Sequence, residues 1–193
     1  NGGLVVVAAD DPSMHSSQNE QDSRFYGKFA LVPTFEPADQ QEAYDMAKAA
    51  FDLSERFRIP VLMRLTTRMA HSRAVVETGE ARAENPLSHP EQPRQWVLMP
   101  GNSRVRYQTL LEDYARLEEE SAASPFNAYT EGPDKRLGII ACGIAHNYVM
   151  ENYPDGCPHP VLKLSQYPLP RDLVRRMASE LSLIHISEPT RRV

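Results

Sequence analysis

The hydrophobic residues of this chain fall into short runs that are separated by longer polar stretches. Four runs consist mostly of Val, Ile, Leu and Ala and are bounded by turn residues, a pattern typical of strands buried on both faces of a parallel sheet. These runs predict strands at residues 4–9, 61–66, 137–142 and 161–164. A shorter apolar run before Pro33 predicts another strand at 29–32.

Between the predicted strands, apolar residues recur every three or four positions, which indicates helices with one buried face. The clearest helix begins after Asp39, which can cap it, and Glu42 can complete a capping box. Its apolar positions are Ala43, Met46, Ala47, Ala50, Leu53 and Phe57. Further helices are predicted at 106–122, at 144–153 and from 172 onward. Strand, helix and strand within about thirty residues form a parallel βαβ unit, so the predicted fold class is α/β.

Residues 79–103 have little periodicity and contain four prolines, which is typical of a linker or a covering segment. Its one apolar patch, at 96–99, is expected to dock the segment onto a core.

The composition changes abruptly at the carboxyl end of the first predicted strand, where a long polar loop begins. In open α/β sheets, ligands bind outside the carboxyl ends of the strands, so this loop is the first candidate site. Its candidate residues are Asp11, His15, Ser16, Ser17, Gln18 and Asn19. The strand at 61–66 ends in a second polar stretch with Arg68, His71 and Arg73. Because parallel strands end at the same edge, both loops should face one cleft, where Arg68 or Arg73 could hold a carboxylate.

The residue types of the first loop allow three interpretations. Asp10, Asp11 and His15 could bind a metal ion, although their spacing fits no established motif. Ser16 or Ser17 could act as a nucleophile beside His15, although no G-x-S-x-G surrounds them. In the third interpretation the Asp and Ser side chains bond the backbone of their own loop.

Composition and charge narrow the class of protein. The 193 residues are 41% hydrophobic and 24% charged, as in ordinary globular proteins, and the net charge of −5 favours neither nucleic acid nor membrane as a partner. No apolar run approaches the roughly 20 residues of a membrane span. The two cysteines, Cys142 and Cys157, are far apart, which is typical of buried thiols in a cytoplasmic protein.

Several segments resemble one protein family. Residues 2–24 resemble the D-D-P-G-M-H-S-S-Q-N-E-Q-D-x-R segment of indolepyruvate:ferredoxin oxidoreductase alpha subunits, with Ser13 in place of Gly. These belong to the thiamine-diphosphate-dependent 2-oxoacid:ferredoxin oxidoreductases. Residues 60–68 resemble the family's P-V-L-L-R-x-T-T-R, followed by H-S-R at 71–73. Residues 137–145, 162–164 and 167–170 resemble the opening of its transketolase C-terminal-like domain.

The resemblance implies a domain organisation. Residues 1–78 would be the second half of a pyrimidine-type thiamine-diphosphate-binding domain. A linker and covering helix (79–135) and the start of a transketolase C-terminal-like domain (136–180) would follow. Residues 181–193 resemble an in-frame translation of a sequencing adapter, so we expect a frayed tail there.

The resemblance also implies an activity and a site. The parent enzyme would oxidatively decarboxylate indolepyruvate or a similar aryl 2-oxoacid, with coenzyme A as acyl acceptor and ferredoxin as electron acceptor. It would hold thiamine diphosphate, Mg²⁺ and 4Fe-4S clusters, and would pair with a beta subunit. His15 would be the catalytic candidate. The cofactor–substrate cleft would contain Asp11, Ser16, Ser17, Gln18, Asn19, Arg68 and His71.

Other parts of that machinery are expected outside these residues. The family's activating Glu precedes Gly2, no G-D-G occurs here, and two isolated cysteines cannot bind a four-iron cluster. The isolated chain is therefore expected to be inactive. Three alternatives stay open: a non-catalytic transketolase-like assembly module, a sister enzyme for pyruvate or another 2-oxoacid, and a metal-dependent hydrolase using Asp10, Asp11 and His15.

Overall fold

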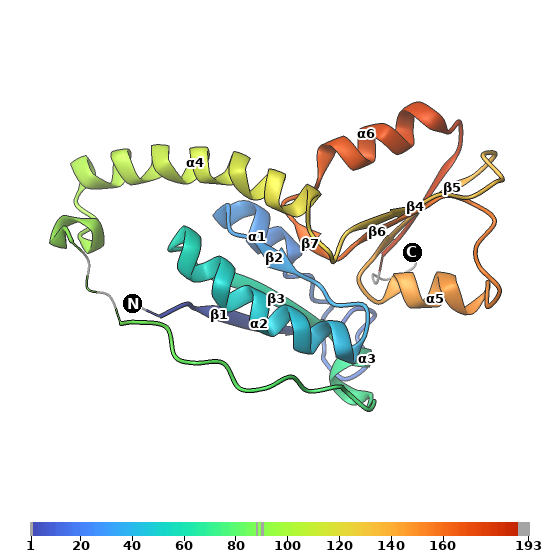
Figure 1. Cartoon of the computed structure of the whole chain (residues 1–193), viewed down its shortest axis with the longest axis horizontal. Helices are drawn as coiled ribbons and strands as arrows, with labels where there is room; N and C mark the ends of the chain where they lie inside the picture. The colour runs from blue at the N-terminus through green and yellow to red at the C-terminus, as the bar shows by residue number, and fades with distance from the viewer. Residues whose placement is uncertain (1, 88, 90, 189–193) are drawn as a thin grey trace.

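The structure, a computed structural model, describes residues 2–87, 89 and 91–188 and contains two four-stranded sheets (Figure 1). The strand order of the first sheet is β1 (Val5–Asp10), β3 (Val61–Thr66), β2 (Thr34–Phe35) and β7 (Gln166–Tyr167). The strand order of the second sheet is β4 (Ala128–Thr130), β6 (Val161–Leu164), β5 (Gly138–Cys142) and β8 (Ile184–Ser187). None of the described helices is both long and apolar enough to cross a membrane.

The first sheet is built on the predicted βαβ unit. β1 and β2 both pair with β3 in parallel, and α2 (Gln40–Phe57) connects β2 to β3. The Asp39 carboxylate caps α2 by accepting a hydrogen bond from the Glu42 amide at 2.8 Å. The Glu42 carboxylate accepts from the Ala38 amide at 2.6 Å, one residue before the Asp39 amide that a capping box would use. Residues of α2, β2 and β3 bury one face of the sheet together with Leu117, and they include Phe35, Met46, Ala50, Leu53, Phe57, Val61 and Met63.

The strand predicted at 29–32 is wrong. The helix α1 (Arg24–Ala30) occupies this region, Leu31 ends it in the left-handed conformation, and β2 follows after Pro33. The aromatic residues Phe25 and Phe29 are four positions apart, which suits a helix better than an alternating strand. Gly27 lets α1 approach β2, because a Cβ there would lie 2.0 Å from the Thr34 hydroxyl oxygen.

The strand predicted at 4–9 is confirmed, but its burial on both faces is wrong. Among the described strands, β1 is an edge strand that pairs only with β3, and Val6 and Val7 are exposed. An edge strand has a neighbour on one side only, so fewer side chains cover it.

The two central strands of the second sheet, β5 and β6, are buried on both faces, as predicted. Ile139 and Ala141 face α5 (Ala145–Glu151), where Val149 packs against them. Ile140 and Cys142 face α6 (Arg171–Glu180), where Met177 packs against them. β5 and β6 are parallel, whereas β4 joins β6 in antiparallel orientation from the segment expected to be linker.

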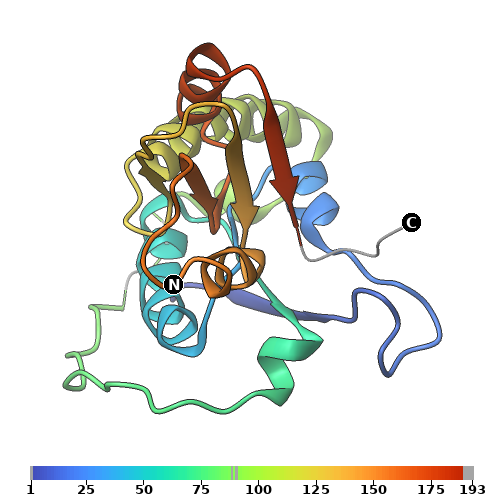
Figure 2. The same ribbon diagram turned by 90° about the vertical axis from the view of Figure 1, so that its right-hand side faces the viewer.

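A long helix, α4 (Pro100–Ala122), runs along the top of the molecule in Figure 1. It begins six residues earlier than the predicted 106, because Pro100 suits the first helical turn. The preceding segment contains one short helix, η1 (Pro93–Trp96), and forms an extended strap along one side of the molecule (Figure 2). The expectation that residues 96–99 dock onto a core is wrong, because the side chains of Trp96, Leu98 and Met99 are exposed.

The expectation of a frayed tail is wrong for residues 181–188. β8 pairs in parallel with β5, and Leu181 is buried against α6 and β5. Residues 189–193 lie outside the described part of the chain.

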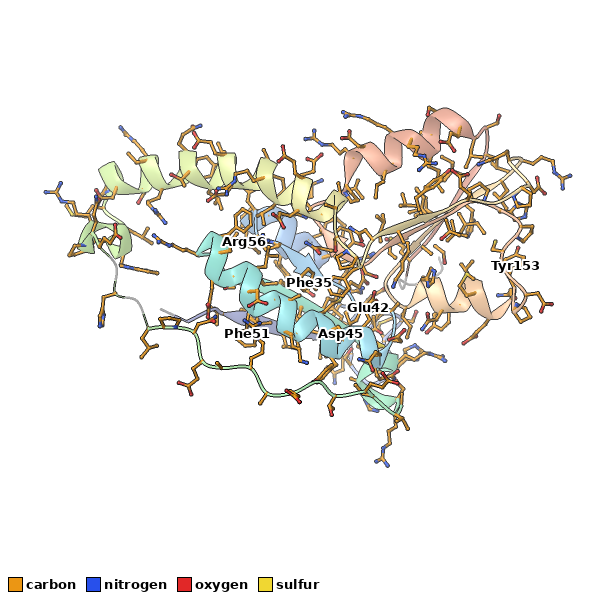
Figure 3. All side chains as sticks on the ribbon, viewed as in Figure 1. Phe35, Glu42, Asp45, Phe51, Arg56 and Tyr153 are labelled. Carbon is orange, nitrogen blue, oxygen red and sulfur yellow. The ribbon has the colours of Figure 1, made fainter. Side chains whose placement is uncertain are left out.

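Polar side chains join the two sheets. β7, which follows β6 directly, crosses over to pair with β2 of the first sheet. The Lys163 ammonium of β6 donates to the Glu42 carboxylate at 2.5 Å, near the start of α2 (Figure 3). At the other end of α2, the Arg56 guanidinium pairs with Glu120 of α4 at 2.6 Å. These contacts fix the first sheet against both α4 and the second sheet.

Candidate functional site

The polar loop after β1 is organised by Asp11, which is buried although residues 13–16 of the loop are exposed. One oxygen of its carboxylate accepts from the amides of Ser16 and Ser17 at 2.7 and 2.6 Å. The other oxygen accepts from the His15 amide at 3.0 Å and from the Thr67 hydroxyl at 2.6 Å. The hydroxyl of Thr67 and the amides of Ser16 and Ser17 hold the pKa of Asp11 well below its ordinary value. Asp11 is therefore an ionised anchor that shapes the loop.

Asp11 binds the amides of His15, Ser16 and Ser17, and most side chains of the loop are exposed. His15, Ser16, Gln18 and Asn19 are exposed and Ser17 is partly buried. The loop extends beyond the edge of the first sheet in Figure 2. Ser13 and Met14, which open the loop, have φ values of 67° and 55°. Ser13, the departure from the family's Gly, therefore occupies a position where glycine is favoured.

The second candidate loop is a short helix, α3 (Thr67–His71), that starts directly beside the first loop. β1 and β3 are in register with Asp10 opposite Thr66, and Thr67 then bonds to Asp11. The two strand ends therefore lie together, as predicted. Arg68 lies elsewhere, with its guanidinium carbon 5.4 Å from the ring centroid of Tyr148 in α5. His71 is exposed, and no described hydrogen bond joins Arg68 or His71 to the side chains of the first loop.

The geometry contradicts two of the three interpretations of the first loop. Asp10 turns inward to Ser23 and Arg64, whereas Asp11 binds loop amides, so the two carboxylates do not converge with His15. The Ser17 hydroxyl lies 2.9 Å from the Asp11 carboxylate and 2.8 Å from the Asn19 carbonyl, so its one proton is donated to one of these acceptors rather than to an imidazole. The third interpretation, in which Asp and Ser side chains bond their own loop, is confirmed.

A buried charge network beneath the loop was missed by the sequence analysis. Arg64 of β3 is 0% exposed, and its guanidinium bonds to the carboxylates of Asp10 and Glu36. Glu36 also accepts from the Tyr167 hydroxyl at 3.2 Å. Burial raises the pKa of Glu36, and the positive charge of Arg64 opposes that rise. The available signal was a charged residue inside an apolar run, which must find partners when the strand is buried.

A cavity of about 600 Å³ also went unpredicted. It lies between α1, β5 and α6, and its lining is mostly apolar, including Ile140 and Leu164. Asp22 and Arg24, at the end of the first loop, also line it, whereas His15–Asn19 do not. The cavity depends on α1, which was not predicted as a helix and whose last two residues fell in the strand predicted at 29–32.

The described residues do not fit a metal centre. They contain no group of three or more His, Cys, Asp or Glu side chains placed to hold a metal ion. Cys142 is buried in β5, where burial raises the pKa of its thiol to about 11, and Cys157 lies in a separate loop. We therefore derive no reaction step through a metal or an iron–sulfur cluster on these residues.

No profile of a known protein family matches the sequence. Individual curated proteins do match. The indolepyruvate oxidoreductase subunit IorA of Archaeoglobus fulgidus is 43% identical over 192 residues, and that of Methanothermobacter marburgensis is 45% identical over 191. These alignments cover 97% and 96% of this chain but 30% and 31% of the two relatives. The chain therefore spans a little under a third of the length of these relatives.

The fold also matches a solved structure. The 2-oxoglutarate:ferredoxin oxidoreductase from Magnetococcus marinus, solved with 2-oxoglutarate, coenzyme A and succinyl-CoA, superposes with a TM-score of 0.63. The match covers 95% of this chain and 41% of that one, at 11% identity, so it supports the fold alone. The sequence identity shows that the chain corresponds, over nearly its whole length, to part of the indolepyruvate oxidoreductase subunit IorA.

Proposed function

We propose that this chain forms part of an enzyme that oxidatively decarboxylates aryl 2-oxoacids such as indolepyruvate. The observation that carries the proposal is the identity of 41–45% to five indolepyruvate oxidoreductase subunits over 96–97% of this chain. The partners in this proposal are the beta subunit, coenzyme A and ferredoxin. Thiamine diphosphate would supply the nucleophile for decarboxylation, and Mg²⁺ and 4Fe-4S clusters would be held by other residues of the parent.

We assign the loop after β1 to the substrate side of that site. Asp11 fixes the backbone, so that the exposed side chains of His15, Gln18 and Asn19 project from a defined base. Such an arrangement keeps polar groups available for a ligand at low cost in conformational entropy. His15 is the catalytic candidate, because its exposed imidazole can donate or accept a hydrogen bond at the carboxyl end of β1. Arg68 and His71 belong to the neighbouring strand end.

The test is His15→Ala in the full-length oxidoreductase that contains this chain. We expect kcat/KM for indolepyruvate to fall by about tenfold or more, the usual scale for a positioned polar group. The melting temperature should stay constant, because the His15 side chain is exposed and contributes little packing. Asp155→Ala, at an exposed loop position of the second sheet, is the matched control and should leave kcat/KM unchanged.

Two results would contradict the assignment. Unchanged kinetics for His15→Ala would make the loop a structural element, as in a non-catalytic assembly module. A higher kcat/KM for pyruvate than for indolepyruvate in the unmodified enzyme would instead favour the sister activity.

A further inference from the structure

The cavity of about 600 Å³ between α1, β5 and α6 has the size and the mostly apolar lining of a small-molecule site. Ile140 and Leu164 of the second sheet and Val174 of α6 supply apolar walls. The helix α1, which lies near the end of β8 in Figure 2, supplies two positively charged side chains. The cavity is separate from the exposed part of the loop after β1, because none of His15–Asn19 lines it.

One of the two positive charges at this cavity has no partner. Arg24 is fully engaged, because its three guanidinium nitrogens bond to Asp22 at 2.6 and 2.8 Å and to Glu188 at 2.7 Å. Lys28 lies one helical turn further along α1 and is exposed. Within the described part of the chain, its ammonium group forms neither an ion pair nor a hydrogen bond. Of the charged side chains that line the cavity, Lys28 is therefore the one left to bind an anion.

Two hydroxyl groups of the lining also form no hydrogen bond with the residues that the structure describes. Thr34 of β2 is only 2% exposed, and its hydroxyl oxygen faces Gly27 of α1. Tyr114 of α4 is partly buried, and this burial raises the pKa of its hydroxyl, which therefore keeps its proton at neutral pH. A buried hydroxyl without a partner costs free energy, and a ligand that bonds to the hydroxyl recovers it.

We propose that this cavity binds a small apolar molecule that carries one carboxylate, at a site separate from the loop after β1. The apolar body would lie against Ile140 and Leu164, where burial of hydrocarbon drives binding. The carboxylate would pair with the Lys28 ammonium. Because the Thr34 hydroxyl lies beside Gly27, the residue before Lys28, it can donate to the same carboxylate. Alkyl and aryl carboxylates share this chemistry.

The charges of the lining favour a single carboxylate over other ligand charges. A cation would compete with Arg24 for Asp22 and Glu188, which both already pair with it. A dianion such as phosphate would bring two charges to one unpaired cation in apolar surroundings, and burying the second charge is costly. Among the described lining residues, only Ile186 and Glu188 belong to the segment that resembles an adapter translation, and neither supplies the proposed contacts.

Isothermal titration calorimetry of the full 193-residue chain tests this proposal. The probes are octanoate, 4-phenylbutanoate and the uncharged 4-phenylbutanamide. At least one carboxylate should bind at one site per chain with a Kd below about 1 mM, as expected for a ligand of this size. Tighter binding of octanoate would indicate an alkyl ligand, and tighter binding of 4-phenylbutanoate an aryl ligand. The amide should bind about tenfold more weakly than 4-phenylbutanoate, because it cannot form an ion pair with Lys28.

Two variants locate the binding site. Lys28→Gln should weaken carboxylate binding by about tenfold and leave amide binding unchanged, because it removes the charge and no apolar wall. Thr34→Val should weaken carboxylate binding by about threefold or more, because it removes the buried donor at nearly constant side-chain size. Lys135→Gln is the control, since it removes the same charge at an exposed position that does not line the cavity, and it should leave binding unchanged.

Three results would overturn the proposal. The first is that neither carboxylate binds at about 5 mM, well above the expected Kd. The second is that 4-phenylbutanoate and its amide bind equally well, so that the charge plays no part. The third is that Lys28→Gln and Lys135→Gln weaken carboxylate binding equally, since the attraction would then be a general effect of net charge.

Discussion

Ser13 has a backbone conformation that its side chain makes costly. Its φ of 67° lies in the left-handed region, where a residue with a Cβ is strained and glycine is not. We expect Ser13→Gly to raise the free energy of unfolding by about 0.5–1 kcal/mol, since relief of strain exceeds the added flexibility of the unfolded chain. Denaturant unfolding measures the change. Ser16→Gly, at a position without positive φ, should be neutral or destabilising, and an equal gain there would contradict the explanation.

Asp11 should make the loop sensitive to acid. Its folded-state pKa is lowered by Thr67 and by the loop amides, so its contribution to stability is complete above its ordinary pKa of 3.8. That contribution is progressively lost as the pH falls below 3.8, because the unfolded chain binds the proton more tightly. Asp11→Asn should be less stable at pH 7, and its difference from the unmodified chain should shrink toward pH 2. Thermal melts across this range measure it, and a constant difference would exclude Asp11 as the anchor.

The predictability of single residues depends on how far away their partners are. The Asp39 cap was predicted because its partner, the Glu42 amide, lies three residues away. Arg64 was missed because Asp10 and Glu36 lie far away in sequence, and only the folded sheet brings them together. The binding of the Asp11 side chain to its own loop was one of three interpretations of this loop, because residue spacing alone does not show which groups a carboxylate contacts.

Among the elements, the central strands β3, β5 and β6 were predicted well, whereas several short or peripheral elements were not. β6 matches its predicted bounds, because three of its four residues are apolar and buried. The end of α1 was mistaken for the start of a strand at 29–32, because the apolar run before Pro33 indicated a buried strand, whereas Phe29 is exposed. The short β7 was not predicted, because its pairing with β2 depends on how the two sheets meet.

Asn127 determines how α4 and β7 are joined. Its amide donates to the carbonyls of Ser121 and Gln166, both at 2.9 Å, and its oxygen accepts from the Ser165 amide at 2.7 Å. Asn127→Ala leaves these buried groups unpaired, so we expect a loss of about 2–4 kcal/mol in the free energy of unfolding. Asn152→Ala, which removes one bond at an exposed position, should cost under about 0.5 kcal/mol. Equal losses in the two variants, measured by denaturant unfolding, would show that burial at this joint does not matter.

At the scale of the whole molecule, the α/β class and the adjacency of the two strand ends were predictable, whereas the arrangement of the sheets was not. Parallel pairing follows from the βαβ pattern, and it brings Thr67 to Asp11. The joint between the sheets depends on contacts such as Lys163 to Glu42, which are 121 residues apart. The apolar run at 96–99 indicated burial, but the strap leaves it exposed.

In the proposed function, this chain holds only part of the active site, and other residues of the parent hold the clusters. Reduction of ferredoxin requires cluster ligands, usually four cysteine thiolates for each cluster, and this chain has two cysteines in separate elements. The isolated chain, supplied with thiamine diphosphate, Mg²⁺, coenzyme A, indolepyruvate and a viologen acceptor, should therefore reduce no acceptor above the protein-free blank. The full-length enzyme with its beta subunit is the positive control under the same conditions. Since the two sheets are joined by buried polar contacts, the isolated chain should still unfold cooperatively by circular dichroism. Acceptor reduction by the isolated chain would show that the complete site lies within these 193 residues, and would contradict the proposal that the cluster ligands lie elsewhere in the parent.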